Sequence, residues 1–544
     1  MLASKANFTK VSPLIETKRP GVIVAALDMG SNSFHLVVAR GHSRGHFEVL
    51  LKEKVMMRLG DEVASTKRIS PSSTVLIKEV IATMANLARG VGATEMVALA
   101  TAAFRDAKNA GAIVDEIEES LGIKVSVISG RKEAELIFEA ISHAVDFGHQ
   151  VVIGADLGGG SMEVTVGTQD ELFGAESFAV GVGRLTTNFI SVKSPSGIDT
   201  AALAGHLDAV LVERLKALRS EYSPATLVLS SGSFLNIARM ALIRDGGPSY
   251  LEASINQATV PLEAILSVNR DLLQMDAKAR SKLTGIDDKR LDLLPAAAVV
   301  LNTLLATLKP KSVLACEWAL REGIILRELA QRSVVEFEGD ENSIKEASVL
   351  AIAARYGWNE GHARQVAELA LSLFDQTREV HLLGDAEREM LYHAALVHDI
   401  GEYISVEGHD RHGAYLLENS RLPGFDMEEK NQLVSVVRYH RRGTPKSEYA
   451  PYAALTKASA IKVTKLAAIL RLADALDRSH TRLINAIEVQ LKPKQVLIFV
   501  SASEEVELEE YGLRRKRQLF EDLFERSVHL VQDGREIAPR LGAN

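Results

Sequence analysis

The sequence contains a single cysteine, Cys316, among its 544 residues. An intrachain disulfide is therefore impossible, and a zinc site built from several cysteines is excluded. Long apolar runs are also absent, since the longest, Pro295–Leu301, is far shorter than the roughly 20 residues of a membrane-spanning helix. The N-terminal segment 1–20 lacks the apolar stretch of a secretory signal. These absences argue against a membrane association and lead us to expect a cytoplasmic protein.

The sequence also has no excess of basic over acidic residues. The formal net charge is −8 at pH 7, which argues against general binding of nucleic acid. Hydrophobic residues make up 47% of the chain and charged residues 25%, as in ordinary globular proteins, so the chain can bury several cores. At about 100–200 residues per domain, the length predicts three or four domains.

Two segments share a strand–turn–strand pattern. In the first, short apolar strands predicted at 22–27 and 35–39 flank a turn rich in Gly, Ser and Asn. In the second, at 151–167, a turn with three consecutive glycines separates two strands. Asp28 and Asp156 occupy matching places in the two segments. The repetition indicates two similar α/β lobes that face each other.

Three turns that follow predicted strands have the composition of phosphate-binding loops. Glycine lets the backbone approach an anion, and Ser and Asn side chains add donors. A single turn of this kind is usually only a tight hairpin, but two with the same Asp-x-Gly opening favour a phosphate site. Asp156 and Glu163 place carboxylates at both edges of the second turn, where a cation bridging phosphate oxygens would lie. The predicted phosphate-binding residues are Asp28, Ser31, Asn32 and Ser33 in the first turn, Gly158, Gly159, Gly160 and Ser161 in the second, and Ser231, Gly232 and Ser233 in the third.

Two charged residues outside the turns are further candidates. Arg105 follows a predicted strand, where its guanidinium could bind phosphate oxygens, although such an arginine is more often part of a surface salt bridge. Glu133 lies in the first turn of a predicted helix that begins near Ser129. A carboxylate there usually stabilises the helix dipole, but in a cleft it could act as a general base.

Seven motifs that occur in order resemble the exopolyphosphatase / guanosine pentaphosphate phosphohydrolase (Ppx/GppA) family. They are DMGSNSFHLVV, ATAAFRDA, ISGRKEAELIF, ADLGGGSMEV, GVGRLTTNF, LSSGSF and ALREGIIL, and they cover roughly 21–332. The resemblance implies two ribonuclease-H-like lobes of the sugar kinase–actin–heat-shock ATPase fold, with the active site in the cleft. It also implies that Glu133 is the catalytic base and that Asp156 and Glu163 bind Mg²⁺. One departure is Lys132, because the family usually has two adjacent glutamates at this point.

The resemblance and the changes in composition together predict the domain boundaries. Lobe I is expected at 21–138 and lobe II at 139–335, after a loose tail at 1–20. An acidic linker is predicted at 336–343, an all-helical domain at 344–482 and a small mixed α/β domain at 483–544. Similarity to long members of the family also implies a homodimer.

The helical segment contains a series of histidines and aspartates that resembles the HD metal-dependent phosphohydrolase superfamily. Imidazole and carboxylate ligands suit a first-row divalent metal. The resemblance implies one site from His362, His398, Asp399 and Asp474, with His412 and His440 as further phosphate contacts or as ligands of a second metal. The alternative is a helical module in which these histidines are only hydrogen-bonded.

The stretch 438–482 has many more Lys and Arg than Asp and Glu in an otherwise acidic chain. A basic helix face is usually just solvated, but beside a phosphate-cleaving lobe it could bind a polyanion. We predict that Lys457, Lys462, Lys465 and Arg471 contact inorganic polyphosphate.

The sequence therefore predicts a processive, Mg²⁺-dependent exopolyphosphatase. Hydrolysis of guanosine pentaphosphate is the alternative within the same family. A polyphosphate- or nucleotide-binding regulator without catalysis is a third reading, which the presence of Glu133 disfavours. A sugar or acyl kinase of the same fold is a fourth, disfavoured by the order of the motifs.

Overall fold

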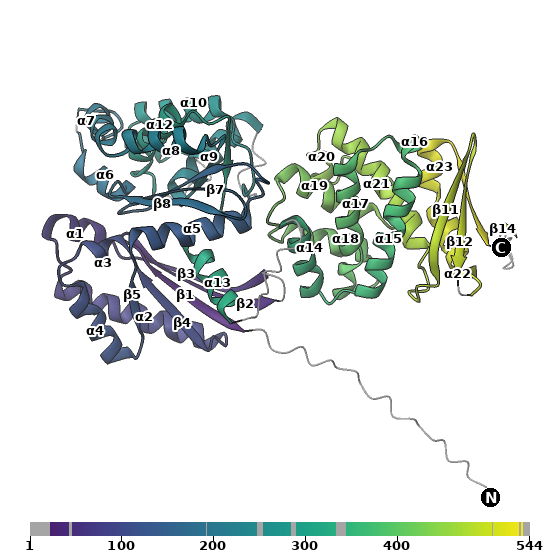
Figure 1. Cartoon of the computed structure of the whole chain (residues 1–544), viewed down its shortest axis with the longest axis horizontal. Coiled ribbons are helices and arrows are strands. Elements are labelled where there is room, and N and C mark those ends of the chain that lie inside the picture. Colours follow the sequence, from purple (N-terminus) through teal and green to yellow (C-terminus); the bar gives the residue numbers. More distant parts are fainter. Residues whose placement is uncertain are drawn as a thin grey trace, which may run out of the picture.

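The computed structural model describes residues 22–42, 46–191, 193–246, 254–283, 290–332, 344–502, 504–532 and 535–536. Two α/β lobes lie one above the other, a helical domain lies beside them, and a small sheet closes the far end (Figure 1). The predicted tail at 1–20 and the predicted linker at 336–343 fall outside the described residues. Among the helices of the described residues, none is both long and apolar enough to cross a membrane.

The first lobe is built on a five-stranded sheet of order β3-β2-β1-β4-β5. Strands β1 and β2 pair antiparallel, as do β2 and β3, whereas β1, β4 and β5 are parallel. The central strand β1 is apolar from Ile23 to Leu27, as expected for a strand covered on both faces, and Asp28 lies near its end. The elements are β1 (Ile23–Met29), β2 (Ser33–His42), β3 (His46–Met56), α1 (Leu59–Thr66), α2 (Pro71–Gly90), β4 (Glu95–Ala100), α3 (Ala102–Asp106), α4 (Ala110–Leu121) and β5 (Val125–Val127).

The second lobe repeats this sheet, with the order β8-β7-β6-β9-β10 and the same strand directions. The predicted pair of similar α/β lobes is thereby confirmed. The strands are β6 (Val152–Leu157), β7 (Met162–Gly167), β8 (Leu172–Phe178), β9 (Thr226–Ser230) and β10 (Ser312–Ala315). The helices are α6 (Val182–Asn188), α7 (Thr200–Leu207), the π-helical turn η1 (Asp208–Val212), α8 (Glu213–Tyr222), α9 (Gly232–Gly246), α10 (Leu262–Gln274), α11 (Ala277–Arg280) and α12 (Leu294–Leu308).

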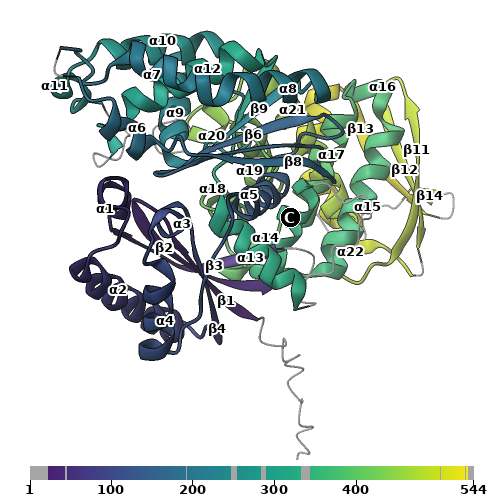
Figure 2. The ribbon, with the colours of Figure 1, turned by 60° about the vertical axis from the view of Figure 1, so that its left-hand side comes forward.

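Two helices, α5 (Gly130–Ala144) and α13 (Leu320–Gln331), join the lobes. Helix α5 packs on strands of the second sheet and α13 on strands of the first, and both views place α5 between the lobes (Figure 1 and Figure 2). They cross so closely that a Cβ on Gly323 would overlap the backbone of Leu136. The predicted boundary between 138 and 139 therefore falls inside α5, and lobe I gains a helix from the end of the predicted lobe II.

The helical domain consists of α14 (Ile344–Arg355), α15 (Glu360–Gln376), α16 (Arg378–His381), α17 (Asp385–Val397), the 3₁₀ turn η4 (Ile400–Tyr403), α18 (His409–Glu418), α19 (Met427–Tyr439), α20 (Ala450–Ala453) and α21 (Lys457–Ala475). The chain ends in β11 (Ile484–Lys492), β12 (Gln495–Ala502), α22 (Glu507–Lys516), α23 (Gln518–Phe524), β13 (Ser527–Gln532) and β14 (Arg535–Glu536). One hydrophobic core runs through both parts, so the predicted domains at 344–482 and 483–544 form a single packed unit.

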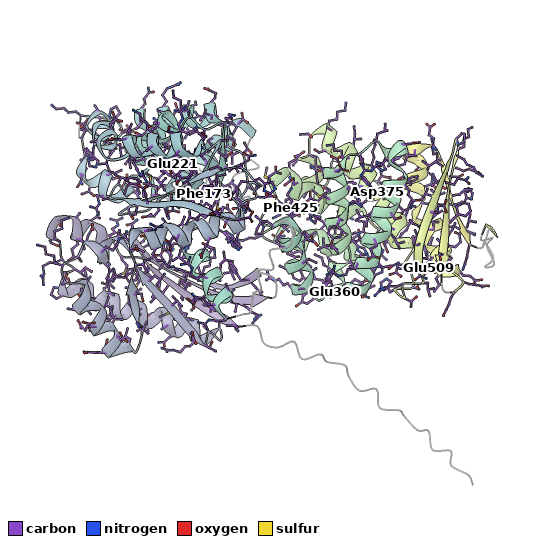
Figure 3. All side chains as sticks on the ribbon, in the orientation of Figure 1. Phe173, Glu221, Glu360, Asp375, Phe425 and Glu509 are labelled. Atoms are coloured by element: carbon purple, nitrogen blue, oxygen red, sulfur yellow. The ribbon has the colours of Figure 1, made fainter. Side chains whose placement is uncertain are left out.

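The helical domain contacts both lobes. Arg355 of α14 forms a 3.1 Å ion pair with Glu48 of the first lobe. The N–H of Gly424 donates to the carbonyl of Ala144, at the end of α5, over 3.3 Å. Phe425 lies at the edge of the helical domain that faces the lobes (Figure 3), beneath the ammonium group of Lys345.

Candidate active site

A cavity of about 890 Å³ lies where the strand ends of both lobes meet. Open α/β folds place ligands at this end of their strands. All three predicted turns line the cavity, as does Glu133 at the start of α5. The residues that the structure brings together here are Asp28, Ser31, Asn32, Ser33, Glu133, Asp156, Gly158, Gly159, Gly160, Ser161, Ser231, Gly232 and Ser233.

The first two turns are held in the same way. The amides of Met57 and Gly60, at the start of α1, donate to the carbonyls of Asn32 and Ser31 over 2.9 and 2.8 Å. In the second lobe, the amides of Val182 and Gly183, in the first turn of α6, donate to the carbonyls of Gly158 and Gly159 over 2.8 and 3.0 Å. With their carbonyls directed at these helices, the turns present their N–H side to an anion.

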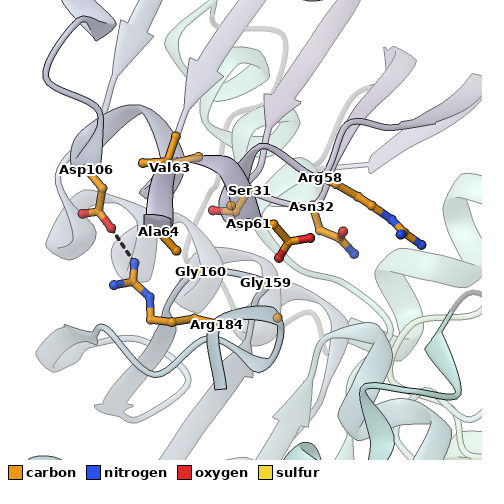
Figure 4. A pocket seen from close by; sticks show the side chains of 13 residues that line it. Ser31, Asn32, Arg58, Asp61, Val63, Ala64, Asp106, Gly159, Gly160 and Arg184 are labelled. Carbon is orange, nitrogen blue, oxygen red and sulfur yellow. Dashed lines mark hydrogen bonds and ion pairs between the residues drawn. The ribbon is translucent and has the colours of Figure 1, made fainter. Parts of the chain in front are cut away.

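The two turns also touch each other, because a Cβ on Gly160 would overlap Ser31. Behind them lies a second cavity of about 390 Å³, between α1, α3 and α6 (Figure 4). In this cavity Arg184 of the second lobe pairs with Asp106 of the first, which ties the lobes together.

We expect Gly181→Ala to disturb the second turn. A Cβ at Gly181 would overlap the backbone of Gly160 and Ser161, so the turn must shift. Phosphate release by the purified variant is expected to fall at least about tenfold, since misplaced groups in a site cost rate steeply. Gly205→Ala is the matched control: it lies in α7 with nothing within 4 Å of the new Cβ, and should keep full activity. Normal activity of the Gly181 variant would show that the turn need not be rigid.

Glu133 is buried and held by Arg105, whose Nη1 donates to Glu133 Oε2 over 2.6 Å. Burial raises the pKa of Glu133, against the opposing effect of the Arg105 guanidinium. Arg105 does not line the cavity and contacts Glu133 and the carbonyl of Ile128 instead. Lys132 points away, toward Glu135 at 3.7 Å, so this departure from the family pattern adds no cation to the cavity.

Three more carboxylates gather near Glu133. Asp156 and Glu163 face each other across β6 and β7, and they accept hydrogen bonds of 2.7 Å from Ser230 and Ser177. Burial raises the pKa of both groups, and that of Asp28 to about 7. Neighbouring carboxylates add to these shifts: Glu133 and Asp156 raise the pKa of Asp28 and of Glu163, and Glu322 raises that of Asp156. A divalent cation would relieve this repulsion. Glu163 lies behind Asp156 and does not line the cavity.

Cavity residues that the sequence reasoning missed are His35, Arg290 and Arg321. Burial, then the charges of Arg321, Lys54, Arg290 and Lys52, hold the pKa of His35 far below its usual range. Neutral His35 accepts from Arg321 at Nδ1 over 3.2 Å, so its Nε2–H donates to Ser33 Oγ over 2.7 Å. The Ser33 hydroxyl hydrogen is then left for an anion. His35 lies in the motif DMGSNSFHLVV and Arg321 in the motif ALREGIIL, so the family motifs could have identified both as candidate site residues.

In the third turn, the hydroxyl oxygens of Ser231 and Ser233 are buried without a hydrogen-bond partner. The guanidinium of Arg290 lies against Gly232, where a Cβ would displace it. Buried hydroxyls need a partner, and a bound phosphate oxygen would supply one.

The predicted histidine series in the helical domain is gathered only in part. His362, His398, Asp399 and His440 lie together, but His412 does not: its Nδ1 lies 3.4 Å from the carbonyl of Ser405, and His409 takes its place in the cluster. Asp474 belongs to neither metal-ligand group found in the described residues; instead it pairs with Lys516, which holds its pKa well below the usual range despite burial.

The predicted basic surface is wrong at Arg471. This side chain is buried, and it donates to the carbonyls of Tyr439 and Gly443. Lys462 pairs with Glu387 at 2.6 Å, and Lys465 donates to the carbonyl of His381 over 2.8 Å. Only the prediction for exposed Lys457 is unaffected by such contacts. A count of charges along the sequence could not reveal which cations point inward.

The fold and the site define a two-lobed α/β protein in which glycine- and serine-rich turns from both lobes, a cluster of buried carboxylates and a candidate base meet at one cavity. A model of the Ppx/GppA phosphatase family matches 37–332, and a model of Ppx/GppA phosphatase domain III matches 344–521. The first match alone spans more than half of the sequence, so the chain belongs to the Ppx/GppA phosphatase family.

Individual relatives and solved structures are consistent with membership in this family. The chain is 29% identical over 332 residues to "Exopolyphosphatase 1" of Mycobacterium tuberculosis, covering 61% of this chain and 94% of that protein. It is 23% identical over 455 residues to the guanosine-5'-triphosphate,3'-diphosphate pyrophosphatase of Photobacterium profundum, covering 82% and 86%. An exopolyphosphatase structure from Cytophaga hutchinsonii matches with a TM-score of 0.52 at 23% identity, over 58% of this chain and 100% of that one. A family member from Aquifex aeolicus matches with a TM-score of 0.50 at 21% identity, over 58% and 99%.

Proposed function

We propose that the protein is an exopolyphosphatase, which releases orthophosphate from the end of inorganic polyphosphate. The observation that carries this proposal is the single cavity that combines phosphate-binding turns from both lobes with buried Glu133. Its relatives named exopolyphosphatase support the assignment.

Glu133 is the proposed general base. Its raised pKa makes it a better proton acceptor at neutral pH than an exposed glutamate. Water attacks the terminal phosphorus, its proton passes to Glu133, and the bond to the bridging oxygen breaks. The products are orthophosphate and a chain one unit shorter. Arg105 is a positioning residue that fixes the Glu133 carboxylate.

The donors of the turns, with Ser33 directed by His35, would hold the terminal phosphoryl group. Asp156 and Glu163 are the proposed holders of Mg²⁺, with Asp28 nearby. Buried carboxylates whose pKa is raised by burial and by nearby negative charge fit such an ion. When bound, Mg²⁺ neutralises charge on the phosphoryl oxygens.

A long polyanion is favoured by the cations at the cavity. Arg290 and Arg321 line it, and Lys52 and Lys54 are close enough to lower the pKa of His35. The charge of Arg421, in the helical domain, lowers the pKa of Lys52. Positive charge therefore extends from the cavity toward that domain. We propose that processive binding uses this cluster rather than the α21 surface. A polyphosphate chain can contact several such cations at once and leave slowly.

Hydrolysis of guanosine pentaphosphate is the second candidate, because the Photobacterium profundum relative of that name matches 82% of the chain. Orthophosphate release from long polyphosphate, guanosine pentaphosphate and ATP, compared at equal concentrations of terminal phosphate, separates the candidates. We expect the highest kcat/KM for polyphosphate. A tenfold preference for guanosine pentaphosphate would overturn the proposal, and no release from any of the three would favour a binding regulator.

The finer features implied by the resemblance are proposals as well. They are ribonuclease-H-like lobes, an HD-like helical domain, a cytoplasmic location and a homodimer. The shared strand order of the two sheets supports the ribonuclease-H-like lobes.

The apolar side chains Tyr403, Ile404, Val406 and Tyr415 are 51–67% exposed on the helical domain and are candidates for a surface that a second copy covers. Light scattering should give twice the chain mass for the wild type and the chain mass for Val406→Asp with Tyr415→Ser.

A further inference from the structure

The cavity of about 390 Å³ behind the first two turns, which we call the rear cavity, is not used by the proposed reaction. Four residues line both this space and the catalytic cavity: Ser31, Asn32, Gly159 and Gly160. A single wall, built from the two turns, therefore separates the two cavities. The terminal phosphoryl group of a substrate would lie against one side of this wall, and the rear cavity begins on the other side.

The wall is a seam between the two lobes. Ser31 and Asn32 follow β1 of the first lobe, whereas Gly159 and Gly160 follow β6 of the second. A Cβ on Gly159 would lie 3.1 Å from the Cβ of Asn32, and a Cβ on Gly160 would overlap Ser31, so the two turns are in direct contact. Because the contact joins separate lobes, a small separation of the lobes opens it.

The rear cavity reaches solvent on the side of the lobes away from the helical domain. Helices α1, α3 and α6 surround it, and they lie at the opposite end of the lobes from that domain (Figure 1). Three of its lining residues, Arg58, Asp61 and Asp106, are exposed. Arg58 and Arg184 extend from opposite sides of the cavity (Figure 4).

The charges of the rear cavity are balanced and span both lobes. Arg184 pairs with Asp106, and the hydroxyl of Thr187 donates to Asp61 over 3.4 Å. Nε of Arg184 is buried without a hydrogen-bond partner, so this guanidinium has a donor left for an oxyanion. With Arg58, the cavity offers two cations against two carboxylates. Such a balance suits a space through which an anion passes without being held tightly.

A processive exopolyphosphatase must release one product while it keeps the other. After each cut, orthophosphate lies at the turns, and the shortened chain still occupies the side of the catalytic cavity that Arg290 and Arg321 line. The chain therefore blocks the path by which it entered. Repulsion between the two anionic products favours departure in the opposite direction.

We propose that the rear cavity is a transit site for orthophosphate, which leaves the catalytic cavity between Ser31 and Gly160 and passes Arg184 on its way to solvent. This inference rests on the proposed polyphosphatase function. As the lobes separate, Arg184 exchanges the Asp106 carboxylate for a phosphate oxygen, so that one charge-assisted hydrogen bond replaces another. No covalent bond changes on this path.

The test closes the rear cavity with a bulky maleimide attached to one cysteine. Ala64 lines the rear cavity but not the catalytic cavity, and Ala64→Cys adds only one heavy atom before labelling. The natural thiol, Cys316, is fully buried and burial raises its pKa, so it should not react in the folded protein. Ser65→Cys is the matched control, since this exposed neighbour in α1 lines neither cavity.

Labelling of Ala64→Cys is expected to reduce steady-state hydrolysis of long polyphosphate at least about tenfold, because product release becomes rate-limiting. The first turnover, measured after acid quenching, should keep its unlabelled rate. Tripolyphosphate should be hydrolysed as fast as before labelling, since its pyrophosphate product leaves by the path of entry and frees that path for orthophosphate. Labelled Ser65→Cys should match its unlabelled form with both substrates.

Added inorganic phosphate gives a second readout on the unlabelled wild type. If phosphate enters from the rear, it should inhibit noncompetitively, and saturating long polyphosphate should not relieve the inhibition. Competitive inhibition would overturn the proposal, as would full activity of labelled Ala64→Cys on long polyphosphate or an equal loss on tripolyphosphate. A wild type that hydrolyses neither substrate would instead refute the proposed function, and the transit site with it.

Discussion

Glu133→Gln is expected to reduce turnover of polyphosphate at least ~100-fold while leaving the fold and chain binding intact, because a general base contributes on this scale. Glutamine has nearly the same shape but cannot accept the proton of the attacking water. It can still bond to Arg105, whose Nη1 lies 2.6 Å from the native carboxylate. The measurement is steady-state orthophosphate release, with binding of polyphosphate followed separately.

Glu135→Gln is the matched control, two residues further along α5. Its carboxylate pairs with Arg131 at 3.3 Å and does not line the cavity. Its turnover should match that of the wild type. Near-normal turnover of Glu133→Gln would disprove the assignment of the base, while an equal loss in both variants would indicate damage to α5 rather than to catalysis.

The second large effect concerns Mg²⁺. Asp156→Asn and Glu163→Gln should each raise the Mg²⁺ concentration for half-maximal activity roughly 10- to 100-fold, the range seen when groups that hold or orient a metal are removed. The two carboxylates face each other across β6 and β7. Removing one charge therefore weakens the attraction for the cation at that edge of the cavity.

A control for this titration is available on the next strand. Glu176 lies on β8 opposite Val164, and its side chain pairs with Arg214 outside the cavity. Glu176→Gln should leave the Mg²⁺ dependence unchanged. If Asp156→Asn and Glu163→Gln also gave the wild-type titration, these residues would not hold the ion.

The site was predictable from sequence where it is local. Asp28 and Asp156 each precede a turn whose glycines and serines are adjacent in the chain, so a short motif contains the whole binding element. The packing of the two lobes was not predictable in this way. Helix α13 follows β10 of the second lobe yet covers the first sheet, because its apolar face packs with α5 between the lobes. No local sequence pattern indicates that α13 packs on the sheet of the other lobe.

In the helical domain, the sequence likewise could not predict the direction of individual side chains. His409 and His412 lie one helical turn apart at the start of α18, and the sequence does not tell which of them faces His440. Likewise, Arg471 counts as a cation in the sequence, but in the fold it caps backbone carbonyls inside the core. Charge and residue type identify candidates, whereas burial and direction require the fold.

The most direct test of the central claim uses long polyphosphate whose two ends are chemically blocked. A cavity that holds a terminal phosphoryl group beside Glu133 requires a free end. We therefore predict rapid orthophosphate release from the unblocked chain and at least ~100-fold slower release from the blocked chain, a loss comparable to that of the base itself. Equal rates, or the appearance of shorter chains from the blocked substrate, would contradict terminal hydrolysis in this cleft.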